Sequence, residues 1–127
     1  MQYDAINGTP SCINGWMSNT VARETWGWEG TIYTDCGALR NVNAHFHKFQ
    51  SGEHTAAVAI KQGTDLECDS VLKKNLGAAL NHSLLDVEDL RVSASRYVRI
   101  EHRKYLLQTA IQTHSNSNRA CFHCCGF

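Results

Sequence analysis

The sequence predicts an α/β fold in which parallel strands alternate with helices, and of which this chain supplies only a part. Segments rich in β-branched residues alternate with segments of helical periodicity along the chain. The three strands that can be recognised are too few to cover the helices packed on both faces of such a sheet. A complete eight-stranded α/β barrel needs about 250 residues, whereas this chain has 127. The pattern is therefore typical of part of a larger α/β protein.

The N-terminal half is predicted to contain two strands and one helix. Tyr3–Ile6 is a short apolar run that stops at a cluster of turn residues. Asn14 is a suitable N-cap for a helix over about 15–25. Gly30–Thr34 is rich in β-branched and aromatic residues, which favours a second strand. Ala38–Gly52 shows no periodicity, so this segment is predicted to be a loop.

The next part of the chain is predicted to be mainly helical. Glu53–Gln62 is rich in alanine, and Gly63 follows it in the position where glycine commonly ends a helix. Residues 64–68 are predicted to form a very short strand. The apolar residues of the segment 70–82 recur at helical spacing, which predicts an amphipathic helix there.

The last helix has the clearest start. Asp86 is its N-cap, and Asp89 three residues later completes a pattern close to a capping box. The helix is predicted to extend to about Ile111. Its predicted buried stripe consists of Val87, Leu90, Ala94, Tyr97 and Val98. The chain is thus divided into a folded part over 1–112 and a Cys- and His-rich tail over 113–127, which is expected to be disordered or loosely packed.

Composition excludes several classes of function. Twelve Lys and Arg balance twelve Asp and Glu, so there is no basic field that would favour nucleic acid as a partner. No run of about 18 apolar residues is present, so no membrane association through a spanning helix is expected. The first residues have neither the basic nor the apolar region of a secretory signal peptide. No motif calls for a cofactor, and none is expected.

Asp35 is the strongest candidate for chemistry on the basis of the predicted elements. In parallel α/β sheets, functional groups gather at the C-terminal ends of the strands. Three places meet this description: the segment after Tyr3, the turn at 35–37 and the segment 64–68. Asp35 ends a β-branched run and is followed by Gly37, which allows a sharp turn. The same pattern also suits a residue that only caps the turn by accepting backbone N–H groups.

Several blocks of the sequence resemble family 3 glycoside hydrolases, in the same order and at similar separations from Tyr3 to about Arg103. The blocks that carry the resemblance are Tyr3–Cys12, Trp26–Gly30 followed by Thr34–Ala38, Gly63–Cys68 and Leu84–Leu90. The resemblance implies a truncated, C-terminal portion of a (β/α)8 TIM-type barrel, with residues 1–112 as part of the N-terminal barrel domain of that family.

The resemblance also implies a retaining mechanism in which Asp35 is the catalytic nucleophile and the substrate is a β-linked oligosaccharide. Tyr3 matches a tyrosine that lies near the nucleophile and the bound sugar, although a core tyrosine at a strand end remains an alternative. The family supplies its acid/base glutamate from a later domain. Glu29, Glu53 and Glu67 do not stand where the family places that residue, so no acid/base is assigned and the isolated chain is expected to be inactive.

Cys36 directly follows the nucleophile position and resembles the β-xylosidase-like branch of the family. In that branch this cysteine can pair with one after the next strand, here Cys68, and the disulfide would narrow the sugar site in favour of a pentose. Two reduced thiols and a β-glucosidase-like specificity are the alternatives. Full-length members of the family are expected to be extracellular, and the missing remainder of the enzyme is a further expected partner.

A small metal-binding or interaction module is the competing hypothesis from another class. The tail contains soft ligands that suit zinc, namely His114, Cys121, His123, Cys124 and Cys125. Ligands crowded into so short a stretch cannot easily reach tetrahedral positions around one ion. No metal site is therefore assigned.

Overall fold

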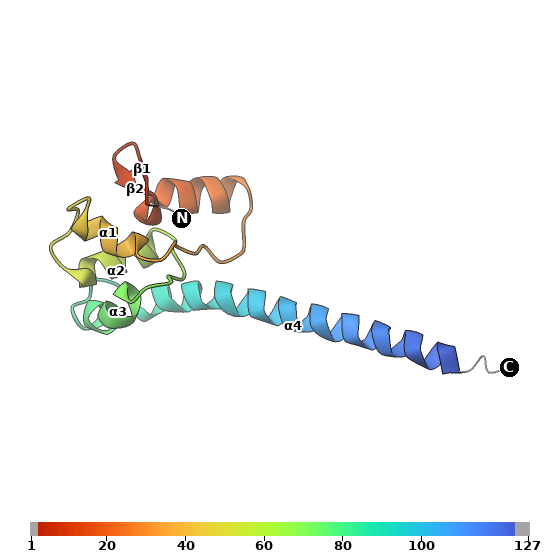
Figure 1. Cartoon of the computed structure of the whole chain (residues 1–127). Helices are drawn as coiled ribbons and strands as arrows, with labels where there is room; N and C mark the ends of the chain where they lie inside the picture. Colours follow the sequence, from red (N-terminus) through yellow and green to blue (C-terminus); the bar gives the residue numbers. More distant parts are fainter. Residues whose placement is uncertain (1–2, 124–127) are drawn as a thin grey trace.

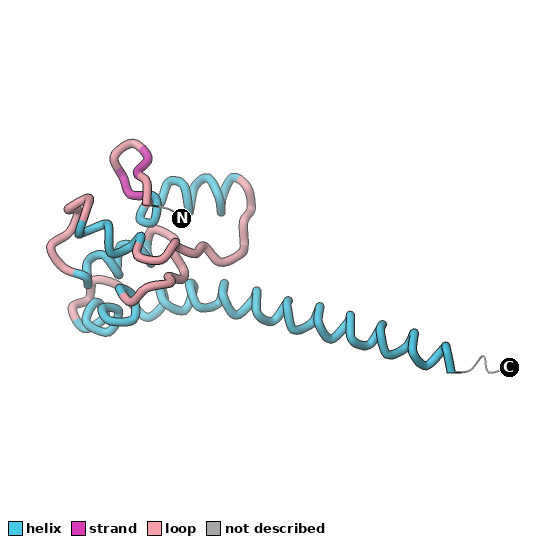
Figure 2. The backbone as a smooth tube through the Cα atoms, viewed as in Figure 1, coloured by secondary structure: helices cyan, strands magenta, loops and turns pink. Residues whose placement is uncertain are grey.

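The computed structural model describes residues 3–123 and is mostly helical. Short helices form a body, and one long helix extends away from it (Figure 1). Strand structure is confined to a small hairpin near the N-terminus (Figure 2). The elements are β1 (Ala5–Ile6), β2 (Thr9–Pro10), the 3-10 turn η1 (Ser11–Ile13), the π-helix η2 (Trp16–Thr25), α1 (Ala38–Ala44), α2 (Gly52–Lys61), α3 (Val71–Asn81) and α4 (Val87–His123).

The segment Tyr3–Ile6 was expected to join a parallel sheet, and the structure corrects this. Its last residues form β1, which pairs antiparallel with β2. Asn7 and Gly8 connect the two strands with φ values of 50° and 74°. Positive φ at both central residues is the geometry of a tight two-residue hairpin turn, and this turn reverses the chain before a longer strand can form.

The other two predicted strands lie side by side in parallel, and the segment 64–68 is very short, as expected. The strand predicted over 30–34 is shorter than expected. A single parallel bridge joins Tyr33 to Leu66. The N–H of Thr34 donates to the carbonyl of Leu66 at 3.1 Å, and the N–H of Asp65 donates to the carbonyl of Ile32 at 2.9 Å. The parallel pairing of these two segments was predicted correctly, whereas the length of the strand over 30–34 was not. An isolated pair of strands is only marginally stable, so the ladder is short.

The helix predicted after Asn14 is present, but it is a π-helix. Asn14 caps its start, because its side-chain oxygen accepts the N–H of Met17 at 3.3 Å. At the other end the N–H of Trp26 donates to the carbonyl of Val21 at 3.0 Å, an i to i+5 bond. This wider winding places Ser18 and Arg23, five residues apart, on the side that faces the body, where both side chains are largely buried.

Helix α1 was not predicted from the sequence. It lies inside the segment 38–52 that was expected to be a loop. Gly37, with φ of +83°, turns the chain into the helix. Ala38, Leu39 and Val42 are all buried. Their spacing of three and four residues is a helical signal, but it is too short to stand out in the sequence.

Helices α2 and α3 occur close to their predicted ranges and form most of the core. Ser51 caps α2 by accepting the N–H of His54 at 3.3 Å, and Gly63 follows with φ of +96°. The buried apolar residues are Cys12, Ile13, Ala38, Leu39, Val42, Ala56, Ala57, Ala59, Ile60, Leu72, Ala79 and Leu85. The core therefore lies between η1, α1, α2 and α3, beneath the two extended segments.

Helix α4 starts as predicted, but it ends later and fewer of its apolar side chains are buried than expected. Asp86 and Asp89 each accept the other's backbone N–H at 3.1 Å, which confirms the capping pattern. The helix continues to His123 instead of ending near Ile111, since no Gly or Pro interrupts it. The predicted buried stripe is wrong, because only Leu90 is half-buried, whereas Val87, Ala94, Tyr97 and Val98 are exposed. The body covers only part of the first turns. No helix among residues 3–123 has the length and apolar character needed to cross a bilayer.

Candidate functional site

The two extended segments, 31–34 and 64–67, form a short ribbon with one covered and one open face. Thr34 and Asp65 are 0% and 8% exposed, whereas Tyr33 and Leu66 are 48% and 37% exposed. Successive side chains of a strand point to opposite faces. Thr34 and Asp65 therefore face the helices, and Tyr33 and Leu66 face away from them. Asp35, one residue after Thr34, stands at the C-terminal end of this ribbon.

Asp35 is exposed and sits in a tight turn. One carboxylate oxygen accepts the N–H of Cys36 at 2.8 Å. The backbone carbonyl of Asp35 accepts the N–H of Ala38 at 3.1 Å, and Gly37 has the left-handed conformation that closes the turn. The residue thus caps its turn, as one reading of the sequence expected. Its side chain is nevertheless exposed to solvent.

Tyr3 and a disulfide lie beside the Asp35 turn. The hydroxyl of Tyr3 donates a hydrogen bond to the carbonyl of Cys36. Cys36 and Cys68 are joined in a disulfide, with their Cα atoms 4.6 Å apart. The bond links the C-terminal ends of the two extended segments. The structure therefore brings together four residues that the sequence analysis had singled out at positions 3, 35, 36 and 68.

Removing the disulfide is expected to lower stability without changing the fold. The bond closes a loop with a sequence separation of 32, and such a cross-link stabilises a small domain by about 2–4 kcal/mol. The double variant Cys36→Ser/Cys68→Ser should lose that amount in urea denaturation followed by circular dichroism. The unmodified chain under a reducing agent is the matched control and should give the same midpoint. Equal midpoints for the double variant and the oxidised chain would contradict the assignment.

A buried ion cluster centred on Asp65 holds the ribbon against η2 and α4. The Asp65 carboxylate, whose side chain is fully buried, binds Arg23 at 2.7 Å and Arg96 at 2.8 Å. It also accepts the N–H of Ile32 at 2.8 Å. Burial lowers the pKa of the Arg23 guanidinium, and the charge of Asp65 opposes that shift. Both carboxylate oxygens of Asp65 thus accept hydrogen bonds. Through the N–H of Ile32, Asp65 positions the strand that leads to Asp35.

The three glutamates considered as further carboxylates are engaged elsewhere. Glu29 pairs with Arg99 at 3.1 Å, and Glu53 pairs with His82 at 2.7 Å. Glu67 accepts the N–H of Leu72 at the start of α3. Burial raises the pKa of Glu67, and this hydrogen bond opposes the shift. Each of the three glutamates thus has at least one partner among the described residues.

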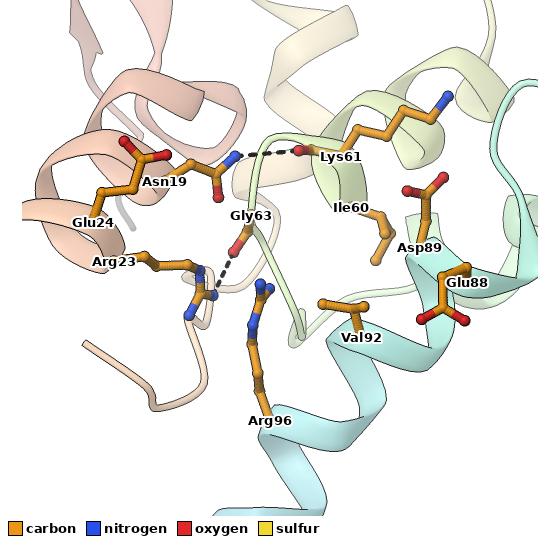
Figure 3. Close-up of a pocket in the computed structure, with 10 residues that line it drawn as sticks. All are labelled: Asn19, Arg23, Glu24, Ile60, Lys61, Gly63, Glu88, Asp89, Val92 and Arg96. Atoms are coloured by element: carbon orange, nitrogen blue, oxygen red, sulfur yellow. Dashed lines mark hydrogen bonds between the residues drawn. The ribbon is translucent and has the colours of Figure 1, made fainter. Parts of the chain in front are cut away.

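A cavity of about 410 Å³ lies beside the ion cluster, between η2, the end of α2 and the start of α4. Arg23 and Arg96 extend toward each other at its centre (Figure 3). Arg23 also donates to the carbonyl of Gly63 at 3.1 Å. The charged residues that line the cavity are Arg23, Glu24, Lys61, Glu88, Asp89 and Arg96. Since basic and acidic side chains balance and both arginines already bind Asp65, the cavity belongs to the structural cluster.

Arg23 and Arg96 were not predicted from the sequence as site residues. Both arginines lie on predicted helices, and nothing in their local sequence indicates that they meet one carboxylate. Asp65 was recognised only as part of a strand end. The three positions are distant in the sequence, so only the packing of η2 and α4 on the ribbon brings them together.

Within the described residues, no group of three or more Cys, His, Asp or Glu side chains is arranged to hold a metal ion. The ligands of the competing zinc hypothesis lie outside the described side chains. Cys12 is a free thiol in the core, and burial raises its pKa to about 11. Such a thiol is protonated at neutral pH, so Cys12 is a packing residue.

No protein-family model matches the chain. It is 43% identical over 91 residues to a probable exo-1,4-β-xylosidase of Aspergillus oryzae, an alignment that covers 69% of this chain and 11% of that protein. A solved GH3 exo-β-xylosidase in complex with a xylobiose aziridine probe superimposes with a TM-score of 0.69 at 29% identity, over 74% of this chain and 12% of that one. A β-glucosidase of intestinal bacteria involved in saponin metabolism gives a TM-score of 0.75 at 26% identity, over 80% and 13%. The chain thus spans about a ninth of the length of the first curated relative it matches.

Proposed function

The chain carries a segment of glycoside hydrolase family 3, and on this premise we propose that it is the C-terminal portion of a (β/α)8 barrel that presents Asp35 as the nucleophile of a retaining β-glycosidase. The main observation that supports the proposal is the contact between Tyr3 and the Asp35 turn. The Tyr3 hydroxyl binds the carbonyl of Cys36, next to an exposed carboxylate at a strand end. Strand ends of this kind are where barrels place their catalytic groups.

The proposed reaction has two steps. One carboxylate oxygen of Asp35 attacks the anomeric carbon, and the bond to the leaving-group oxygen breaks as a second carboxyl group protonates that oxygen. Water, deprotonated by the second group, then cleaves the glycosyl-enzyme and releases the sugar with retained configuration. The second carboxyl must stand about 5–5.5 Å from the first. We assign it to a part of the longer protein outside this chain.

The preferred substrate in this proposal is a β-xyloside at the end of a xylo-oligosaccharide. The disulfide at Cys36 and Cys68 joins the two strand ends that would border the sugar, which leaves less room for the extra hydroxymethyl group of a hexose. The named relative is an exo-xylosidase. A β-glucosidase-like specificity is the second candidate, favoured by the superposition on the intestinal β-glucosidase. A disulfide also suits an extracellular enzyme.

A graft tests the proposal directly. Residues 3–103 of this chain would replace the matching segment of the Aspergillus oryzae protein. The graft is expected to hydrolyse an aryl β-xyloside, and to do so faster than the corresponding aryl β-glucoside. A folded graft that cleaves the glucoside faster would favour the second specificity. A folded graft with neither activity would contradict the assignment.

The isolated chain is expected to be inactive on xylobiose. It holds the proposed nucleophile, but its glutamates 29, 53 and 67 are bound to other groups. Without an acid to protonate the leaving group, glycosidic cleavage lacks the general-acid contribution of about 100- to 10,000-fold. Release of xylose from xylobiose, whose leaving sugar hydroxyl departs only when it is protonated, should not exceed that of a buffer blank when the purified chain is added. Turnover above the blank would show that the chain contains its own acid.

A further inference from the structure

Two segments of the chain have the Asn-x-Ser/Thr pattern that accepts N-linked glycans. One is the segment 7–9 in the N-terminal hairpin, and the other is the segment 81–83 at the end of α3. Their structural settings differ. Thr9, the hydroxyl residue of the first segment, is half-buried and pairs with Ile6 between β1 and β2. The second segment forms the turn that follows a helix.

The acceptor amide and the hydroxyl of the second segment are exposed in a well-formed turn. Asn81 is the last residue of α3, and both Asn81 and Ser83 are exposed. Ser83 has φ of 55°, and its N–H donates to the carbonyl of Leu80 at 3.0 Å. The ring of His82, between the two, contacts the carboxylate of Glu53 on α2 at 2.7 Å. The contact of the middle residue with α2 leaves the two flanking side chains at the surface.

A hollow of about 350 Å³ lies next to this turn, and both Asn81 and Ser83 line it. Its volume is within the range of sites that hold small molecules, so it has room for one sugar ring. Val87, which is 69% exposed, is part of the lining and offers an apolar surface for the ring. Lys61 and Asp86 also line the hollow and can form hydrogen bonds with sugar hydroxyl groups.

We infer that Asn81 is an N-glycosylation site and that the first sugar of its glycan occupies this hollow. The inference rests on the extracellular location in the proposed function. The disulfide of Cys36 and Cys68 agrees with such a location, because disulfides form in oxidising compartments such as the lumen of the endoplasmic reticulum. In eukaryotic cells N-linked glycans are added in the same compartment, and the named curated relative is fungal.

The transfer uses a lipid diphosphate-linked oligosaccharide as the donor. The Nδ2 atom of Asn81 forms a bond to the anomeric carbon of the first sugar, and the bond from that carbon to the diphosphate oxygen breaks. The lipid diphosphate leaves with the electron pair of the broken bond, and the amide loses one proton. The hydroxyl of Ser83 is the second element of the acceptor pattern.

The test is secretion of the graft of residues 3–103 from a yeast host, followed by site-resolved mass spectrometry before and after enzymatic removal of N-linked glycans. Asn81 should carry a glycan in most molecules. Asn81→Gln and Ser83→Ala should each lose it completely, because they remove the acceptor amide and the required hydroxyl. His82→Ala is the matched control. It changes the middle residue alone and should keep the glycan.

The place of the first sugar is tested by thermal unfolding. An endoglycosidase that leaves one N-acetylglucosamine on Asn81 gives the form to compare with an Asn81→Gln graft treated in the same way. The form with the sugar should unfold at a higher temperature, because the sugar covers Val87. This difference should vanish in a Val87→Lys background. It should persist in a Val98→Lys background, since Val98 is an exposed residue of α4 that does not line the hollow.

Turnover is a separate readout, because no residue of the turn at 35–37 lines the hollow. An active graft without a glycan on Asn81 would overturn this inference alone, and so would a glycan on Asn7 in place of Asn81. An inactive graft that carries the glycan on Asn81 would remove the proposed activity alone. Equal unfolding temperatures with and without the sugar would overturn its placement in the hollow.

Discussion

Asp65→Asn is expected to destabilise the chain by about 3–5 kcal/mol, the cost of breaking a buried ion pair by removing one charge. The substitution keeps the shape of the side chain but leaves Arg23 and Arg96 buried without a negative partner. Both guanidinium groups lie within 2.8 Å of the carboxylate, whose side chain is 0% exposed. A small domain is stable by only about 5–15 kcal/mol, so the loss would be a large part of the total.

The control for this prediction is Asp69→Asn, four residues along the chain. Asp69 pairs with Arg40 at 3.7 Å, and that arginine is largely exposed. Surface pairs of this kind contribute less than about 1 kcal/mol. Urea denaturation followed by circular dichroism should separate the two variants clearly. Similar midpoints would mean that the Asp65 cluster does not hold the ribbon to η2 and α4.

Asp35→Ala in the graft is expected to lower turnover of an aryl β-xyloside by roughly a thousandfold or more, because loss of a nucleophile removes the covalent route. Asp35 is exposed, and its contacts hold only its own turn. The variant graft should therefore remain folded. Azide, a small anion that can occupy the space of the lost carboxylate, should restore part of the turnover and give a glycosyl azide of inverted configuration.

The matched control for Asp35 is Glu88→Gln, which also neutralises one carboxylate. Glu88 lies near the start of α4, where its exposed side chain pairs with Arg91. The control graft should keep its turnover. An Asp35→Ala graft that is as active as the control would remove Asp35 from the mechanism and leave it as a turn cap only.

The sequence predicted the local features that depend on neighbouring residues. The Asp86 and Asp89 cap, the glycine that ends α2 and the Asp35 turn each need only a few adjacent residues, and each is present. The parallel neighbourhood of the segments around Tyr33 and Leu66 also followed from the order of the elements. Helix α1 was not predicted because its apolar signal spans fewer than two turns. The end of α4 was placed too early because no residue marks it.

The sequence by itself determined which residues follow the β-branched segment 30–34, namely Asp35, Cys36 and Gly37. It also showed a tyrosine, Tyr3, close to the first residue. Local backbone preferences are sufficient to predict a turn from such residues. Only the tertiary structure decided that Arg23, Asp65 and Arg96 share one buried site. These contacts join residues far apart in the chain. Their free energy is the balance between the cost of removing charges from water and the attraction within the buried cluster, which no local pattern records.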